Sequence, residues 1–526
     1  MTTNLIGISF GTGFSCISIV GKVLDLTQPG TQPMPIANED GDRQIPSYVA
    51  FTGHEVLCGT QAKVQALANP LGTIFQFRNI LGKSYADDQV QHIASKYRMN
   101  IVGHPEDDSM PAYEVKVIAT EEGEEDGVEH HSVHQVTAAY LAKLKETAEY
   151  FTSKAVHGCV ISIPAHFEES QKEALLNAAK EAGFETTYPI HESVAASLAY
   201  DNGKKMTKHE KNILVLDLGA QQFNITYQTY HDGLYTIKES VEVDNLGGAN
   251  FDEILVEFAR QEFKRKYKCD VAENRRSMQK LRTSCERTKR ALSRQDTAPC
   301  QVESLFEGMD YNGNMIRARF DALCEPLYTK CKQAVLDTIK LCNLTPESID
   351  QVLLIGGSSK MPRFQAVMKA LFPNPDTDIQ INVDPDEVIS VGCAVQAKIF
   401  LENITEWSKV DPEVTAAQVT SVSIGIETST GEFYPVIPAG TPIPVRREVS
   451  IPLADRKQTE VYLAVYQGES QTAKDNELLA ELVVSDMVAE DNAPRHVDIV
   501  FAVEMDLELT VVASEKSSGQ KTQVSV

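Results

Sequence analysis

The stretch that decides the fold is Asp217-Leu218-Gly219-Ala220-Gln221-Gln222-Phe223-Asn224. It lies between two apolar runs, residues 212–216 and 225–227, so it predicts a strand, a tight turn and a return strand. Glycine lacks a Cβ, so the backbone N–H groups of such a turn can approach an anion closely. An ordinary turn is the alternative, because Asp and Gly are common turn residues.

The same plan occurs a second time near the N-terminus. Residues 5–10 form an apolar run, Gly11, Thr12 and Gly13 form the turn, and a second apolar run begins at Phe14. Ser9 stands where the later copy has Asp217. We therefore predict a duplicated α/β unit, in which each lobe presents a phosphate-binding hairpin to a shared cleft.

The composition is that of a globular protein with more than one domain. The 526 residues are 42% hydrophobic and 23% charged, which is enough for two or more full cores. The net charge of -25 argues against direct DNA binding, which needs a basic surface. The sequence contains neither an apolar run of about 18 residues nor a signal-peptide pattern. We therefore expect no membrane span and a cytoplasmic location.

The ten cysteines do not form a metal-binding pattern. No C-x-x-C pair occurs, and no histidine cluster has zinc spacing. We therefore expect buried thiols in a reducing compartment. The last hundred or so residues contain no cysteine, which indicates a separate domain.

Helical and strand-like patterns alternate through the first part of the chain. Helices are expected at residues 57–70, 136–151, 168–183, 191–200, 277–293 and 388–402, a strand at 158–164, and a polar loop or hairpin at 87–127. Two more glycine turns, Gly247-Gly248 and Gly356-Gly357-Ser358, each precede a helix, whose N-terminus favours negative charge. Alternating strands and helices predict a mainly parallel sheet covered by helices.

The pattern changes after residue 403. Helical periodicity mostly disappears, and alternating runs separated by turns predict an antiparallel β-sandwich. We expect an α/β nucleotide-binding domain over 1–403, an interdomain linker over 404–418 and the β-sandwich over 419–526.

Taken in order, the motifs resemble those of the seventy-kilodalton heat-shock chaperone family. The resemblance rests on Ile6-Gly7 to Phe14, Pro164-Ala165-His166-Phe167, Asp217-Leu218-Gly219, Leu246-Gly247-Gly248, residues 285–293, Ile355-Gly356-Gly357-Ser358, Asp384-Pro385-Asp386-Glu387 and Tyr466-Gln467-Gly468-Glu469-Ser470. It covers nearly the whole chain and implies an actin-like, two-lobed ATPase fold followed by a β-sandwich substrate-type domain. The family's helical lid has no counterpart in the sequence, so a truncated β domain is expected.

The resemblance implies ATP as the cofactor and suggests which residues contact it. Glu286, Lys289, Arg290 and Ser293 would hold the adenosine; Gly356, Gly357 and Ser358 would contact ribose and phosphate; Asp386 would lie beside the base. Gly11, Thr12, Gly13, Phe14, Asp217, Gly219, Gly247 and Gly248 complete the expected set. Lys360 stands where the family usually has arginine, which stacks on adenine, so a weaker base contact is expected.

Several positions that serve hydrolysis in the family are changed. Ser9 replaces a carboxylate, and Gly13 replaces a threonine. Arg78 replaces a lysine that places the attacking water. In the second loop, two glycines, a threonine and an aspartate are replaced by Ala220, Gln221, Gln222 and Asn224. Asp217 and Glu192 are retained. Phosphoryl transfer needs a positioned water, Mg²⁺ and cations at the phosphates, so we predict ATP binding with little hydrolysis. We assign no catalytic residue and no metal ligand, and Mg²⁺ has only weak support.

The weak hydrolysis signature, altered linker and missing lid resemble an atypical ribosome-associated branch of the family in fungi, which pairs with the J-domain protein zuotin. This implies a heterodimer that assists nascent chains by stimulating a conventional chaperone of the same family. The partner's N-terminal segment would dock on the β domain or a lobe, and the ribosome would be contacted mainly through that partner, because rRNA repels an acidic chain. Two alternatives remain: an active ATP-hydrolysing chaperone that binds peptides itself, and an actin-like small-molecule kinase.

Overall fold

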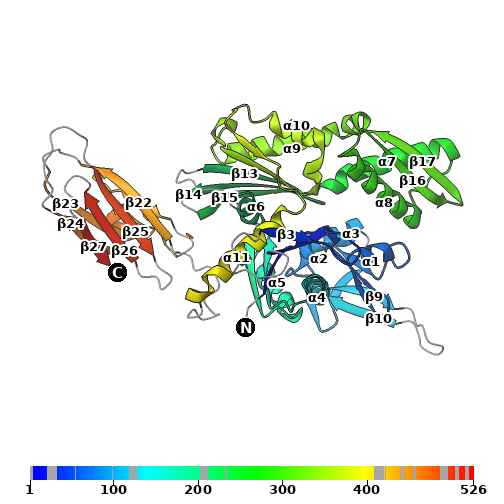
Figure 1. Ribbon diagram of the computed structural model, residues 1–526, viewed down its shortest axis with the longest axis horizontal. Helices are drawn as coiled ribbons and strands as arrows, with labels where there is room; N and C mark the ends of the chain where they lie inside the picture. The colour runs from blue at the N-terminus through cyan, green and yellow to red at the C-terminus, as the bar shows by residue number, and fades with distance from the viewer. Residues whose placement is uncertain are drawn as a thin grey trace. The chain divides into compact units, whose positions relative to one another are not determined.

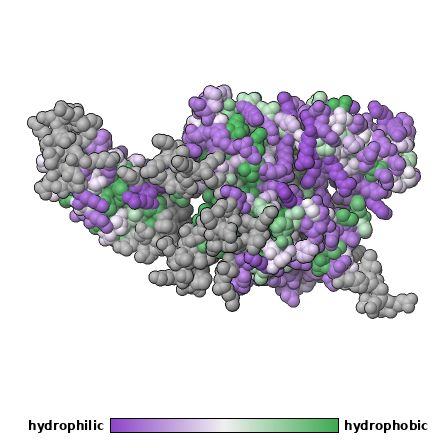
Figure 2. Space-filling view, viewed as in Figure 1, coloured by the Kyte–Doolittle hydropathy of each residue, from purple (hydrophilic) through white to green (hydrophobic). Residues whose placement is uncertain are grey.

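The computed structural model describes residues 4–20, 32–53, 55–97, 99–117, 127–201, 211–231, 234–407, 420, 422–438, 441, 445–453, 458–485, 496–503, 509–515 and 521–526. The chain divides into two compact units, Met1–Thr405 and Glu406–Val526 (Figure 1). None of the described helices is long and apolar enough to cross a membrane. The face of the N-terminal unit seen in Figure 2 is mainly hydrophilic.

The first lobe is built on a mixed sheet with the strand order β12-β11-β1-β2-β3 and β4 paired to β2. Its strands are β1 (Leu5–Ser9), β2 (Phe14–Val20), β3 (Pro33–Ile36), β4 (Ile45–Pro46), β11 (Gly158–Ile163) and β12 (Thr186–His191). The helices of this part are α4 (Val133–Thr152), α5 (Glu169–Glu181) and α6 (Glu192–Asp201). All three helices lie where the sequence predicts them.

Two smaller three-stranded sheets complete this lobe. They consist of β5 (Tyr48–Phe51), β6 (Val56–Cys58) and β7 (Thr73–Phe75), and of β8 (Ile101–His104), β9 (Asp107–Val117) and β10 (Gly127–Ser132). Their helices are α1 (Thr60–Gln65), α2 (Phe77–Ile80) and α3 (Asp88–Tyr97). The helix expected at 57–70 is only six residues long. The loop or hairpin expected at 87–127 is confirmed for its hairpin, because β9 pairs antiparallel with β8 and β10, and is wrong for α3. Residues 118–126 of that expectation lie outside the described residues.

The second lobe repeats the plan of the first. Its sheet has the order β15-β14-β13-β18-β19, with β13 (Lys211–Leu218), β14 (Phe223–His231), β15 (Leu234–Val243), β18 (Gln351–Ile355) and β19 (Asp378–Gln380). In each lobe a hairpin, β1–β2 or β13–β14, is antiparallel, and its first strand pairs in parallel with a later strand, β11 or β18. The predicted duplication is thus confirmed at the level of strand pairing.

The rest of the second lobe is mainly helical. It comprises α7 (Gly248–Tyr267), α8 (Arg275–Leu292), the hairpin β16 (Thr297–Phe306) and β17 (Met309–Ile316), α9 (Arg317–Leu341), η1 (Pro346–Ser348), η2 (Gly357–Lys360) and α10 (Pro362–Lys369). The helix α11 (Val388–Trp407) connects the lobes, because its residues share one apolar core with Leu5 and Val160 of the first sheet and Ile213 of the second. A Cβ on Gly7 would lie 2.3 Å from the Ala394 nitrogen, so this helix packs directly on β1.

The C-terminal unit contains two four-stranded antiparallel sheets around one apolar core. The first has the order β21-β20-β23-β24 and the second β22-β25-β26-β27. Their elements are β20 (Ile424–Glu427), β21 (Phe433–Ile437), β22 (Val445–Pro452), β23 (Val461–Gln467), η4 (Ala473–Asp475), β24 (Glu477–Val484), β25 (His496–Val503), β26 (Leu509–Glu515) and β27 (Lys521–Ser525). Of the expected linker, residues 404–407 belong to α11, and residues 408–418 lie outside the described residues.

Candidate nucleotide-binding site

The first hairpin loop, Gly11 to Phe14, is held by a neighbouring strand. The Ser47 hydroxyl donates to the Gly11 carbonyl oxygen at 2.7 Å, and the Ser47 amide donates to that of Gly13 at 3.0 Å. A Cβ on Gly11 would lie 2.2 Å from the Phe14 carbonyl oxygen, so only glycine fits there. Thr12 is partly exposed at the turn. The loop is thus fixed before any ligand binds.

The two hairpin loops meet across the lobes at Gly13 and Ala220. A Cβ built on Gly13 would lie 2.6 Å from the Ala220 Cβ, far inside the usual contact distance between carbon atoms. Gly13 has no positive φ, so its glycine is required here by space and not by backbone conformation. The loss of a side chain at 13 therefore makes room for the side chain at 220.

The backbone of the second loop is bonded to the start of α7. The Gly248 amide donates to the Gly219 carbonyl oxygen at 2.9 Å, and the Ala249 amide donates to that of Ala220 at 2.8 Å. The Ser358 hydroxyl also donates to the Gly219 oxygen, at 3.0 Å. Helix N-termini usually offer free N–H groups to anions. Here the loop itself satisfies two of them.

The side chains of the second loop have partners on both lobes. The Tyr97 hydroxyl, at the end of α3, donates to Gln221 Oε1 at 2.7 Å. The Gln222 amide donates to Glu242 on β15, whose other oxygen lies 2.8 Å from His166 Nε2. Although burial opposes ionisation, the His166 contact lowers the pKa of Glu242. A Cβ on Gly247 would lie 2.4 Å from the Gln221 carbonyl carbon, so α7 also packs on this loop.

A charged cluster lies beside the mouth of the second hairpin. Arg78 on α2 forms a buried ion pair with Glu192 at the start of α6, with 2.5 Å between Nη2 and Oε1. The Arg78 guanidinium also lies over the Phe167 ring, 5.7 Å from its centroid. Burial and the Glu192 carboxylate raise the pKa of Asp217 well above its usual range, against the effect of Arg78. The Arg78 guanidinium is therefore bound to Glu192 and is not a free cation.

The basic helix α8 contacts the opposite lobe. Lys63 on α1 forms an ion pair with Glu286 at 2.8 Å, and Glu286 also pairs with Arg290 at 3.0 Å. The Phe14 ring lies between two cations, with Lys63 Nζ 4.8 Å and Arg290 Cζ 4.5 Å from its centroid. Although burial opposes ionisation, Lys63 and Arg290 lower the pKa of Glu286. Part of the expected adenosine site thus joins the two lobes directly.

Lys289 points from the same helix to the start of α7. Its Nζ donates to the Gly248 carbonyl oxygen at 2.8 Å and lies 2.9 Å from Asp252 Oδ2. Burial raises the pKa of Asp252, although Lys289 opposes the shift. Ser293 follows the last residue of α8, and its hydroxyl donates to the Lys289 carbonyl oxygen at 3.4 Å.

The Gly356-Gly357-Ser358 turn brings the remaining predicted residues together. Gly356 has a φ of 78°, and a Cβ there would lie 2.3 Å from Asp217 Oδ1. Lys360 Nζ lies 2.6 Å from Asp384 Oδ1 and 2.7 Å from Asp386 Oδ2. Burial opposes its charge, but these carboxylates raise the pKa of Lys360. Within the described residues Asp386 Oδ1 has no hydrogen-bond partner, although it is buried beside Gly357.

The arrangement suits an anionic ligand with a ring at one end. Lys289 lies at the start of α7 beside the second glycine loop, Arg290 lies against Phe14 of the first loop, and the unpaired Asp386 oxygen at the Gly356–Gly357 turn can accept a hydrogen bond. No group of three or more potential metal ligands occurs among the residues that the structure describes. Sequence reasoning missed Lys63, Tyr97 and Glu242, which lie far along the chain from their partners.

Comparisons with known proteins agree with this architecture. The chain matches the Hsp70 protein family over residues 5–526. A heat shock 70 kDa protein of Neurospora crassa is 33% identical over 524 residues, which cover 99% of this chain and 77% of that protein. The heat shock cognate 70 kDa protein 3 of Dictyostelium discoideum is 32% identical over 523 residues, with coverages of 99% and 80%. A ribosome-associated molecular chaperone of Saccharomyces cerevisiae is 31% identical over 521 residues, with coverages of 99% and 81%. These matches show that the chain belongs to the Hsp70 family.

Proposed function

We propose that this Hsp70-type chaperone binds ATP, hydrolyses it poorly, and acts in the cytoplasm as a subunit of a ribosome-associated complex with a J-domain protein. In that complex it assists nascent-chain folding by stimulating a conventional chaperone of the same family. Family members bind ATP with Mg²⁺, and the cofactor contacts proposed for this chain are those described above. The finer role rests on the second hairpin loop and on the C-terminal unit.

The second hairpin loop is the observation that carries the proposal of poor hydrolysis. Its carbonyl oxygens accept from α7, and its side chains at 221 and 222 are bonded to Tyr97 and Glu242. Gln222 lacks the threonine hydroxyl that the family's loop offers to the terminal phosphate, and the bonded Gln221 and Gln222 side chains stand where glycine backbone would approach that phosphate. Arg78, which stands where the family has the lysine that places the attacking water, is held by an ion pair with Glu192. These contacts support a bound ATP that persists.

The residues expected to contact the nucleotide support the proposal that ATP binds. The Gly356-Gly357 turn leaves room where a Cβ would meet Asp217 and Asp386, and Asp386 keeps a free acceptor oxygen. Lys289 lies beside Gly248 at the start of α7, where its charge and the helix dipole favour a phosphate, although Asp252 pairs with this lysine and two amides of the helix are bonded to the loop. Lys360 is held by two carboxylates, which supports only a limited contribution to base binding.

A single-turnover ATPase assay tests this proposal. Purified full-length protein is mixed with labelled ATP, binding is measured by retention of label, and phosphate release is followed with and without a J-domain protein. We expect retention of ATP with release close to the uncatalysed background. An Hsp70 of ordinary activity serves as the positive control. Comparable turnover in both proteins would favour the alternative, an active chaperone that binds peptides itself.

A variant that restores the loop sharpens the same test. Substitution of Ala220→Gly, Gln221→Gly, Gln222→Thr and Asn224→Asp removes the side chains that tie the loop to Tyr97 and Glu242. If the loop limits hydrolysis, this variant should release phosphate measurably faster than the natural chain. An equal rate in both would show that the loop is not the cause.

The C-terminal unit presents a surface that suits a partner segment. On the sheet β21-β20-β23-β24, Tyr462 is opposite Val483 and Tyr466 is opposite Leu478. Tyr462, Val483 and Leu478 are 58%, 48% and 47% exposed, and we call these three residues, with the buried Tyr466 beside Leu478, the aromatic face. The four described strands carry three carboxylates, on Glu427, Glu477 and Glu481, and no Lys or Arg.

This aromatic face supports the proposed partner by its chemistry. The Tyr462 hydroxyl bonds to Glu481 and the Tyr466 hydroxyl to Glu427, so carboxylates surround the apolar centre. A segment with basic and apolar residues, such as the N-terminal segment of a zuotin-like J-domain protein, would match it in both charge and hydrophobicity. The net charge of -25 is consistent with a ribosome contact that runs mainly through that partner.

Two point variants test the docking surface. Val483→Lys places a cation on the aromatic face and should weaken binding of the J-domain protein at least about tenfold, a cost of about 1.4 kcal/mol. Thr510→Lys, on the other sheet, is the matched control and should bind normally. Unchanged affinity in Val483→Lys would remove this face from the partner site.

A further inference from the structure

Two cysteine thiols face each other between α8 and β16. The Sγ atoms of Cys285, on the helix, and Cys300, on the strand, are 3.8 Å apart. Both residues are buried, and each is free of any disulfide. A disulfide has an S–S length of about 2.05 Å, so a sulfur displacement of about 2 Å would join them. Each thiol therefore has a partner within reach of a small local movement.

Polar groups lie around the Cys300 thiol. Ser284 Oγ lies 3.5 Å from Cys300 Sγ, and the same hydroxyl bonds to the Gln301 carbonyl oxygen at 2.9 Å. The hydrogen bond with Cys285, together with Ser284 and Thr288, lowers the pKa of Cys300 although burial opposes ionisation. The thiolate is the nucleophile in thiol oxidation, and Cys300, unlike Cys285, lines a cavity, so we take Cys300 as the residue that an oxidant reaches first.

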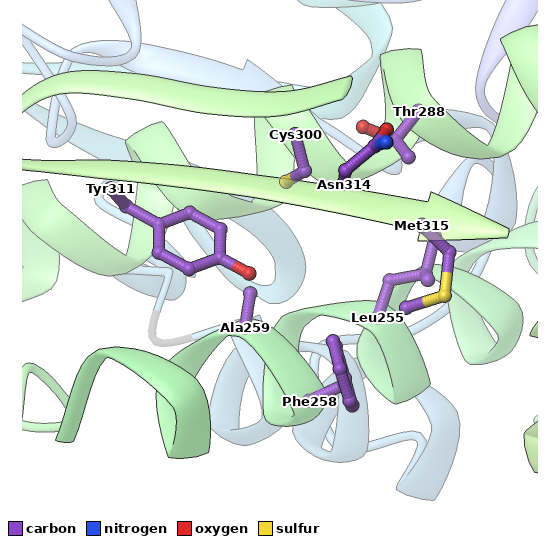
Figure 3. A pocket seen from close by; sticks show the side chains of 8 residues that line it. All are labelled: Leu255, Phe258, Ala259, Thr288, Cys300, Tyr311, Asn314 and Met315. Carbon is purple, nitrogen blue, oxygen red and sulfur yellow. The ribbon is translucent and has the colours of Figure 1, made fainter. Parts of the chain in front are cut away.

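A small cavity gives Cys300 space on its other side. It is enclosed mainly by apolar side chains of α7 and of the β16–β17 hairpin, and Figure 3 shows the Cys300 sulfur among them, together with Tyr311 and Ala259. Its lining residues are Leu255, Phe258, Ala259, Thr288, Cys300, Tyr311, Asn314 and Met315. A small, mainly apolar space disfavours a bulky or ionic oxidant more than a small uncharged one such as hydrogen peroxide.

We propose that Cys285 and Cys300 form a reversible disulfide when the protein meets hydrogen peroxide. The Cys300 thiolate attacks one peroxide oxygen, the O–O bond breaks, and the products are a sulfenic acid and, after protonation, one water. The Cys285 thiol then attacks that sulfur, the S–O bond breaks and a second water leaves. Two thiols lose two electrons and one peroxide gains them. A cellular thiol reverses the step by exchange.

The position of the two cysteines on α8 and β16 links their oxidation to the contacts between the lobes. Cys285 directly precedes Glu286, which pairs with Lys63 of the other lobe, and Arg290 lies on the same helix against Phe14. A shift of α8 toward β16 therefore alters the contacts that join the lobes. We therefore expect oxidation to change the rate of nucleotide release, and this expectation rests on the proposed ATP site. The formation of the disulfide does not depend on that site.

Peptide mapping of the full-length protein tests the proposal. The protein is treated with hydrogen peroxide, remaining thiols are alkylated, and a digest is analysed by mass spectrometry without reduction. We expect a peptide pair joined through Cys285 and Cys300, loss of two of the ten thiols, and recovery of both after dithiothreitol. Retention of all ten thiols, a disulfide between other cysteines, or a sulfinic acid on Cys300 would each overturn the proposal.

Cysteine variants distinguish the formation of the disulfide from its effect on nucleotide release. Cys300→Ala and Cys300→Ser should both lose the linked peptide, while Cys331→Ala, a buried cysteine on α9 in the same core, should keep it. Circular dichroism identifies any variant that fails to fold, and the second Cys300 variant then replaces it. If the disulfide forms but nucleotide release is unchanged, the coupling through α8 is wrong and the modification site stands. If ATP does not bind at all, the mapping still decides the disulfide.

Discussion

Substitution of Gly13 is the most direct test of how the two hairpin loops fit. In Gly13→Ala the new Cβ would lie 2.6 Å from the Ala220 Cβ, whereas carbon atoms in contact are about 3.5 to 4.0 Å apart. The loops must therefore separate by about 1 Å. Overpacking of this kind costs about 1 to 3 kcal/mol. If the cost falls on the closed arrangement of the lobes, the equilibrium shifts toward opening by about 5- to 150-fold.

The assay is release of a fluorescent ATP analogue measured by stopped flow. We expect the release rate of Gly13→Ala to rise within that range, and the double variant Gly13→Ala with Ala220→Gly to return to within about threefold of the natural chain. Ala220→Gly alone should have a small effect, because it removes only one methyl group. The reasoning is refuted if the single variant at 13 releases nucleotide normally, or if the double variant is no slower than that single variant.

Three further predictions concern the same interlobe region. Arg78→Ala leaves the Glu192 carboxylate buried without its partner, so the free energy of unfolding should fall by about 3 to 5 kcal/mol in urea denaturation, and Arg78→Lys should recover part of it. Asp217 has a raised pKa in the folded chain, so the folded state keeps a proton that the unfolded state releases, and the contribution of Asp217 to stability decreases as the pH rises above about 4. Asp217→Asn should remove this pH dependence and be more stable than the natural chain at pH 8 in thermal denaturation. Equal pH profiles of the two proteins would contradict the assigned burial of Asp217. Tyr97→Phe removes the donor to Gln221 and should speed nucleotide release by about five- to tenfold, the equivalent of about 1 kcal/mol, while an unchanged rate would show that this hydrogen bond does not hold the lobes together.

Local patterns predicted the elements whose signal lies within a short window. The helix over 133–152 and the strand over 158–163 have clear periodicity or a continuous apolar run, and both occur as expected. The two hairpins were recognisable because glycine turns separate matched apolar runs. These features depend on neighbours in sequence, so a single chain is enough to show them.

Other elements depend on contacts that sequence order hides. The polar composition of 87–127 suggested a solvated loop or hairpin. The hairpin is present, but Val90 and Ile93 bury one face of α3, and Tyr113 and Val115 bury one face of β9. Tertiary packing outweighs local polarity there. The helix expected at 57–70 stops at Gln65, five residues before the proline that suggested its end.

The candidate site likewise contains residues that local motifs predicted and residues that only the structure shows. Glycine turns and the basic helix marked the residues of the second lobe, because each motif is contiguous. The pairing of Lys63 with Glu286 and of Tyr97 with Gln221 joins residues more than a hundred positions apart, so no local pattern could indicate either. The sequence showed that both Gly13 and Ala220 differ from the family, but only the structure shows that the two changes touch.

That contact has a consequence for the order in which mutations could accumulate. A side chain at 13 is excluded while 220 carries its methyl group, and a return of 220 to glycine alone leaves the loop still bonded through Gln221 and Gln222. Each single reversal is therefore either harmful or leaves those bonds in place. Under the proposed poor hydrolysis, recovery of turnover would need several changes at once, so the two loops constrain each other's substitutions by epistasis.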